Sequence, residues 1–123
     1  MCDFRSFLEH EKQISIHNIE RQNKALEWYQ DGDSLAAGHQ KLIAVQQRHI
    51  AMINTLLEGK VDVDMTLATC EQALKLAEEK HRKMISRHEE NDELWWETSD
   101  VIQFISSLIY RIEDWKCRHQ PTT

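Results

Sequence analysis

Apolar side chains recur along this chain at helical spacing. The clearest run covers residues 94–115, where large apolar residues return every three or four positions. A period of 3.6 residues places such side chains on one face of an α-helix. The stripe consists of Leu94, Thr98, Val101, Ile105, Leu108, Ile112 and Trp115. This pattern predicts a helix that buries one face.

Three other segments carry less regular stripes. In the second helix the apolar face is predicted to contain Leu35, Leu42, Val45, His49, Ile53 and Leu56. In the third it contains Leu67, Cys70, Leu74, Ala77, His81, Met84, Ile85 and His88. The first is the weakest, because Glu11, Ser15 and Gln22 fall among its apolar positions.

Glycine and proline mark the breaks between these segments. The glycines are Gly32, Gly38 and Gly59, and the one proline is Pro121. Gly59 is typical of the residue that follows a helix C-terminus. We predict helices over about 3–31, 34–58, 65–90 and 92–117, with a tail at 118–123.

Candidate caps stand before two of these helices. Asp33 or Ser34 can cap the second helix and Asp64 the third, because short polar side chains accept hydrogen bonds from the first N–H groups of a helix. Breaks this short make successive helices antiparallel neighbours. We therefore predict an all-α single domain over 1–123, a four-helix up-down-up-down bundle. The alternative is a pair of extended helical hairpins that completes a bundle by dimerisation.

Composition narrows the class of protein. The net charge is −6 and no stripe of Lys and Arg is present, so we expect no nucleic-acid partner. No apolar run is long enough to span a membrane. The three cysteines are far apart and lack zinc-site spacing. We expect an acidic cytoplasmic protein with reduced thiols and no cofactor.

Histidine is abundant, with seven in 123 residues. If the second and third helices are antiparallel neighbours, His39 lies between the levels of His81 and His88. Glu78 stands three residues before His81, a spacing that carboxylate-bridged di-iron bundles use for inward ligands. His39, Glu78, His81 and His88 are thus candidate metal ligands. The alternatives are partly buried histidines bonded across helices, or a pH-sensitive packing role.

Two carboxylate motifs allow an enzymatic hypothesis. The chain reads Glu78-Glu79-Lys80-His81-Arg82, and later Glu97-Thr98-Ser99-Asp100 followed by Val-Ile-Gln-Phe-Ile. The second motif is similar to the Glu-x-x-Asp element of MazG-type nucleotide pyrophosphohydrolases, which are small helical bundles that hold Mg²⁺. The first departs from that family, since Arg82 stands in place of its third Glu. The resemblance implies Glu78, Glu79, Glu97 and Asp100 as catalytic candidates.

Several aromatic residues lie off the predicted apolar faces. Trp96 and Tyr110 are far from the centre of their helix's stripe, Phe104 flanks it, and Trp28 is off the face of the first helix. Aromatic residues are enriched at protein interfaces. The alternative is a broad core face covered by the first helix.

These aromatics support the leading hypothesis, a helical protein that acts by protein–protein contact as a regulator, adaptor or chaperone-like factor, and forms a dimer. The predicted interface is Trp28, Trp96, Phe104 and Tyr110. The alternatives are a Mg²⁺-dependent pyrophosphohydrolase and a His/Glu metal-binding or metal-sensing bundle.

Overall fold

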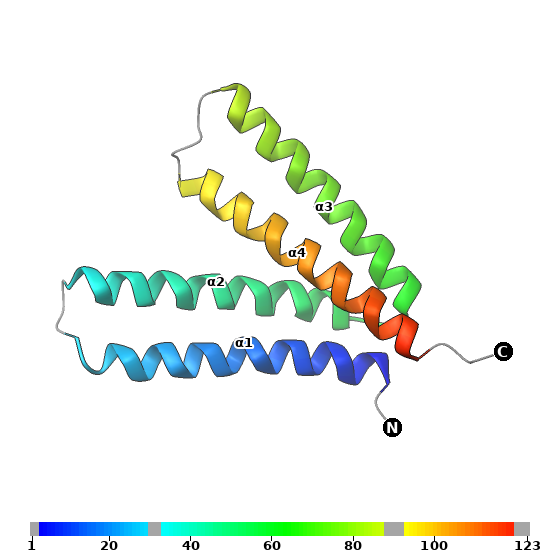
Figure 1. Ribbon diagram of the computed structural model, residues 1–123, viewed down its shortest axis with the longest axis horizontal. Helices are drawn as coiled ribbons and strands as arrows, with labels where there is room; N and C mark the ends of the chain where they lie inside the picture. Colours follow the sequence, from blue (N-terminus) through cyan, green and yellow to red (C-terminus); the bar gives the residue numbers. More distant parts are fainter. Residues whose placement is uncertain (1–2, 30–32, 88–92, 120–123) are drawn as a thin grey trace. The chain divides into compact units, whose positions relative to one another are not determined.

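The computed structural model describes residues 3–29, 33–87 and 93–119. This part of the chain forms four helices and no strand: α1 (Phe4–Leu26), α2 (Ser34–Leu57), α3 (Val63–Ser86) and α4 (Glu93–Arg118) (Figure 1). The prediction of an all-α protein with four helices is confirmed. None of the described helices is both long and apolar enough to cross a membrane.

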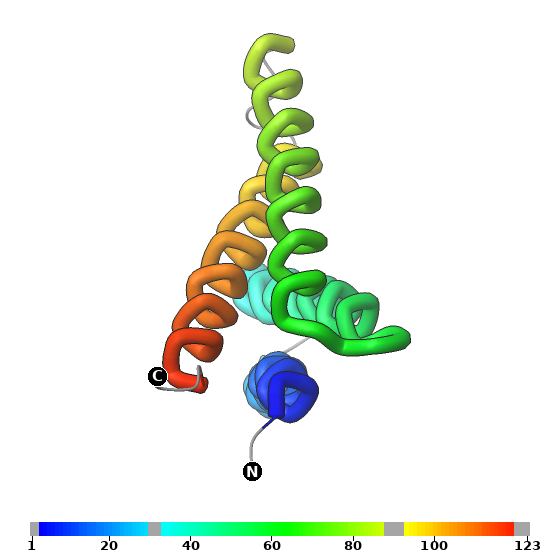
Figure 2. Tube along the Cα trace, turned by 90° about the vertical axis from the view of Figure 1, so that its right-hand side faces the viewer, coloured from blue at the N-terminus to red at the C-terminus, as the bar shows by residue number. Residues whose placement is uncertain are grey.

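The helices pack in pairs of sequence neighbours. α1 packs against α2, and α3 packs against α4 (Figure 2). The chain divides into two compact units, Met1–Val61 and Asp62–Thr123. We call them the first and the second hairpin. This pairing is the antiparallel arrangement that the short breaks predicted for each pair.

Aspartates cap the three helices whose N-terminal caps are described. The Asp3 carboxylate accepts from Ser6 N at 2.8 Å, and the Asp33 carboxylate accepts from Leu35 N at 2.9 Å. The cap of α3 is Asp62, which accepts from Met65 N at 2.9 Å. The prediction of Asp64 as this cap was wrong by two residues, because Asp62 already has the extended backbone that a capping residue needs.

Two helices end earlier than predicted. α1 ends at Leu26 rather than near residue 31. Beyond it, the backbone N–H groups of Trp28 and Tyr29 donate to carbonyls three residues back, Ala25 O and Leu26 O, and so form turns rather than α-helix. α3 stops at Ser86 rather than near residue 90. Residues 30–31 and 88–90 of these predictions lie outside the described residues. Local turn bonds satisfy the last carbonyls, so the helical period need not continue.

The C-terminus of α2 follows the prediction. Gly59 has φ 69°, a left-handed conformation that glycine adopts without steric cost. The guanidinium of Arg5 donates to Leu57 O at 3.0 Å and to Gly59 O at 3.1 Å. A cation at the end of a helix also interacts favourably with its dipole. This contact ties the start of α1 to the end of α2.

The seam of the first hairpin is partly polar. The buried residues of α1 include Glu11 and Ser15 beside the apolar Phe4 and Leu8. Further along, His39 Nδ1 of α2 donates a hydrogen bond to Gln22 Oε1 of α1. The buried residues of α2 are Ala36 and Ile53. The polar positions that interrupt the first stripe therefore lie in the seam itself.

The second hairpin has a more apolar seam. Of the stripe predicted in α4, Thr98, Ile105, Leu108 and Ile112 are buried, whereas Leu94 is exposed. α3 contributes Thr66, Cys70 and Met84. At the open end of this hairpin, Lys116 Nζ lies 2.7 Å from the Asp64 carboxylate. The periodic pattern thus identified the buried face of α4.

Candidate functional site

A groove runs between the two helices of the second hairpin. Its volume is about 370 Å³. Each helix contributes side chains at positions i, i+3 and i+4, a spacing that puts them on one face. α3 supplies Glu78, His81 and Arg82, and α4 supplies Ser99, Ile102 and Gln103. The groove therefore combines a basic, an acidic and several hydrogen-bonding groups with the apolar side chain of Ile102.

His81 is held in this groove by two residues of α4. Its Nε2 lies 2.8 Å from Ser99 Oγ. Its ring stacks on the indole of Trp95, with centroids 4.7 Å apart and planes at 28°. Trp95 and Ser99 are four residues apart and share a helix face. The imidazole is therefore fixed between a hydroxyl and an aromatic ring.

The indole pair beside His81 reaches the surface. Trp96 meets Trp95 edge to face, with centroids 4.7 Å apart. Trp95 Nε1 is buried and has no hydrogen-bond partner among the described residues. Trp96, in contrast, is 59% exposed. The exposed indole of Trp96 therefore packs on Trp95, which in turn stacks on His81 beside the groove.

The contact between His81 and Ser99 joins a hydroxyl to a basic nitrogen, as nucleophilic catalysis requires. Acyl transfer also needs N–H donors aimed at the developing oxyanion. Ser99 lies in the interior of α4, where backbone N–H groups bond to carbonyls one turn back. The backbone around Ser99 therefore supplies no such donors. We interpret the pair as a contact that orients the imidazole.

Of the four catalytic candidates, the groove contains Glu78. Glu79 is exposed and pairs with Lys83 at 3.6 Å. Glu97 is exposed and Asp100 half-buried on α4, and both take part in other interactions. Glu78 shares the groove with Arg82, the residue that departs from the pyrophosphohydrolase motif. The enzymatic assignment remains a prediction.

The candidate metal ligands belong to different parts of the chain. His39 lies in the first hairpin, where it bonds Gln22 and stacks on Tyr29 with centroids 5.3 Å apart. His81 lies in the second hairpin with its own partners, and His88 is outside the described residues. Across residues 3–29, 33–87 and 93–119, no three His, Cys, Asp or Glu side chains form a group that could hold a metal ion.

The predicted interface residues differ in exposure. Trp28 is 87% exposed and Tyr110 is 73% exposed. Phe104 is half-buried and already takes part in an interaction. Trp96, Gln103 and Tyr110 are all exposed and follow one another at seven-residue intervals along α4. We call these three residues the aromatic row.

Sequence reasoning missed some of these features. It did not pair His81 with Ser99 or Trp95, although antiparallel packing of α3 and α4 about their connection would have brought them to one level. It also placed Leu35 and Leu42 on a buried face, but they are 60% and 48% exposed. Ile53 of the same predicted stripe is buried as expected, whereas Ala36, which lies outside the stripe, is buried in place of the two leucines. Ile85, predicted on the buried face of α3, is 44% exposed.

Two groups in the second hairpin have shifted pKa values. Burial raises the pKa of the Cys70 thiol to about 11, with the nearby Glu71 adding to the shift. The hydrogen bond to Asp64 raises the pKa of Lys116, and the charge of that carboxylate adds to the effect. Neither group lines the groove.

Comparison of the chain with protein-family models, with curated proteins and with solved structures gives no match.

Proposed function

We propose that this protein is a helical interaction module, a small regulator, adaptor or chaperone-like factor that binds another protein. The observation that carries the proposal is the exposure of Trp96 and Tyr110 on the aromatic row. Trp and Tyr are enriched among the residues that dominate binding energy at interfaces. Two of them on one helical face make this side of α4 the proposed contact surface.

The groove beside the row supports the same proposal. Gln103 belongs to both features, and Arg82 and Glu78 stand across from it on α3. Interfaces commonly combine an aromatic centre with a rim of polar groups. A partner seated on Trp96 and Tyr110 would also reach these polar side chains.

Trp28 forms a separate part of the proposed interface, because it belongs to the first hairpin. The described cysteines, Cys70 and Cys117, are both free thiols, which fits a reducing compartment such as the cytoplasm. We include a second copy of the chain among the proposed partners, as a homodimer.

The test is the double variant Trp96→Ala/Tyr110→Ala. We expect helix content by circular dichroism to stay unchanged, because both side chains are exposed. We expect association, measured by sedimentation velocity over a concentration series, to weaken at least about tenfold, as for interface hot spots. The matched control is Leu76→Ala, which removes an exposed apolar side chain from α3, outside the aromatic row.

An unchanged sedimentation profile would contradict self-association through the row. A photo-reactive phenylalanine analogue at position 110 then tests for a different partner in extracts of the native cell. Absence of any specific adduct at this position, together with unchanged sedimentation, would overturn the proposal.

A further inference from the structure

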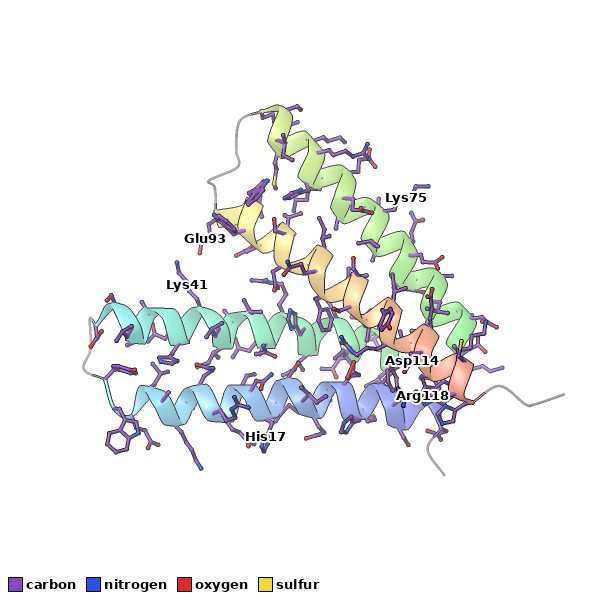
Figure 3. All side chains as sticks on the ribbon, in the orientation of Figure 1. His17, Lys41, Lys75, Glu93, Asp114 and Arg118 are labelled. Atoms are coloured by element: carbon purple, nitrogen blue, oxygen red, sulfur yellow. The ribbon has the colours of Figure 1, made fainter. Side chains whose placement is uncertain are left out.

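α2 is electrostatically unusual for this acidic chain. The sequence contains 21 Asp and Glu residues, yet none lies within Ser34–Leu57. The charged side chains of α2 are Lys41 and Arg48. Lys41 projects from α2 on the side away from α1 (Figure 3). Because α2 contains no acidic side chain, it does not repel an anionic partner.

The same helix exposes large apolar side chains. Leu35 and Leu42 are one heptad apart, and both are exposed. Residues seven apart on a helix lie on nearly the same face. Two leucines at this spacing can both contact one helix packed along α2.

α1 continues this surface. The hydrogen bond between Gln22 and His39 sets the register of the hairpin. In that antiparallel register Arg21 comes level with Gln40, two residues from Leu42, and Ile14 lies two turns further along α1, level with Gln47. Ile14 and Arg21 are both exposed. We group these four exposed side chains of the two helices, Ile14, Arg21, Leu35 and Leu42, under the name α1–α2 face.

A shallow groove of about 370 Å³ lies along the α1 part of this face. Its lining contains no acidic residue, and its residues are His10, Gln13, Ile14, His17, Asn18 and Arg21. An apolar side chain is thus surrounded by basic and hydrogen-bonding groups. The apolar member of this lining is Ile14 and its permanent cation is Arg21, while His17 lies 3.6 Å from the carboxylate of Glu20.

We propose that the α1–α2 face binds an acidic amphipathic helix of a partner protein. This inference rests on the proposed function, since it names the class of partner. A helix laid along the hairpin would place its apolar residues, repeating every 3.5 positions, against Ile14, Leu35 and Leu42. Its flanking carboxylates would meet Arg21 and Lys41. Opposite charges on such flanks determine which helices pair.

The experiment uses two synthetic helical peptides of four heptads, both with Leu at positions a and d. One carries Glu at e and g, and the other carries Lys. Fluorescence anisotropy of labelled peptide measures binding to the full chain. We expect the Glu peptide to bind at least tenfold more tightly than the Lys peptide. The difference should shrink at high salt, because ions screen surface charges.

Variants of the chain locate the contact. Leu42→Glu and, independently, Leu35→Glu should each weaken binding of the Glu peptide at least tenfold, and Arg21→Glu should narrow its preference over the Lys peptide. The matched control is Gln40→Glu, exposed on α2 and 200° around the helix from Leu42 at roughly 100° per residue. It should change binding less than twofold. Circular dichroism confirms that each variant stays helical.

Equal binding of both peptides, no binding of either, or an equal effect of Gln40→Glu would overturn the inference. If the chain self-associates and Leu42→Glu abolishes that association without any peptide binding, the occupant is a second copy and the inference is again wrong. The aromatic row lies in the other hairpin. A negative result with the peptides therefore does not affect the test of the aromatic row, which the Trp96→Ala/Tyr110→Ala variant measures separately.

Discussion

Cys70 shows how burial changes the chemistry of a single side chain. It is buried in the second hairpin, and its pKa rises from 9.0 to about 11. Desolvation disfavours the thiolate, which is the reactive form of cysteine. The thiol therefore stays neutral under conditions in which an exposed cysteine would begin to ionise.

This shift predicts a loss of stability in alkali. In the unfolded chain the thiol ionises near pH 9, while in the folded chain it stays protonated to about pH 11. The contribution of Cys70 to the free energy of unfolding is thus complete below pH 9 and is lost as the pH rises to about 11. Urea unfolding at pH 8 and pH 10.5 measures the difference.

The control is Cys70→Ala in the same background, with position 117 changed to serine in both proteins. Any other group that titrates over this range does so in both proteins. The difference between the two proteins in how the free energy of unfolding changes with pH therefore reports the Cys70 thiol. Equal slopes for the two proteins would contradict the assignment of the shift to Cys70.

Among the helices, α1 and α2 show how polar residues can specify a pairing. The hydrogen bond from His39 to Gln22 lies in a half-buried part of the seam. A buried polar pair fixes register when an offset would leave its members without partners. The seam also contains the buried Glu11 and Ser15. We interpret these positions as setting the alignment of the first hairpin rather than maximising its stability.

A double-mutant cycle tests this interpretation. Gln22→Leu alone leaves His39 without its acceptor and should lower the free energy of unfolding by about 1 kcal/mol. Gln22→Leu with His39→Leu replaces both polar groups by apolar ones and should be close to neutral or stabilising. The coupling from urea unfolding should exceed about 0.5 kcal/mol.

Gln47→Leu serves as the reference, because Gln47 is exposed on α2. It should change stability by no more than about 0.5 kcal/mol. Additive effects at positions 22 and 39 would show that the bond does not couple the two helices.

The whole molecule consists of two hairpins joined by a short link. The division falls between Val61 and Asp62, and Lys60 is exposed beside it. A protease needs an extended, accessible segment, which exposed links supply and helices do not. The link is therefore the natural site for the first cut between the two units.

Limited trypsin digestion should cut early after Lys60 and release fragments 1–60 and 61–123, identified by mass spectrometry. Arg87, exposed just after α3, is the second expected site. Lys60→Gln should remove the first cut and leave the second unchanged. Early cuts inside α2 or α4, at Arg48 or Arg111, would contradict the division into two helical hairpins.

The sequence by itself was sufficient to predict the four helices. Their period, the polar caps and Gly59 are local features, and each acts within a few residues of its position. The buried face of α4 was predictable for the same reason, because its stripe is long and regular. The exposed aromatics Trp96 and Tyr110 followed from their distance to that stripe.

Only the tertiary structure decided which residues meet across helices. In α2, the predicted stripe is buried at Ile53 but exposed at Leu35 and Leu42, and Ala36, which the stripe did not include, is buried. The pairing of His81 with Ser99 likewise depends on the register of α3 against α4. A helical period determines a face to within about one residue, whereas a side-chain contact requires the rotation and axial position of both helices.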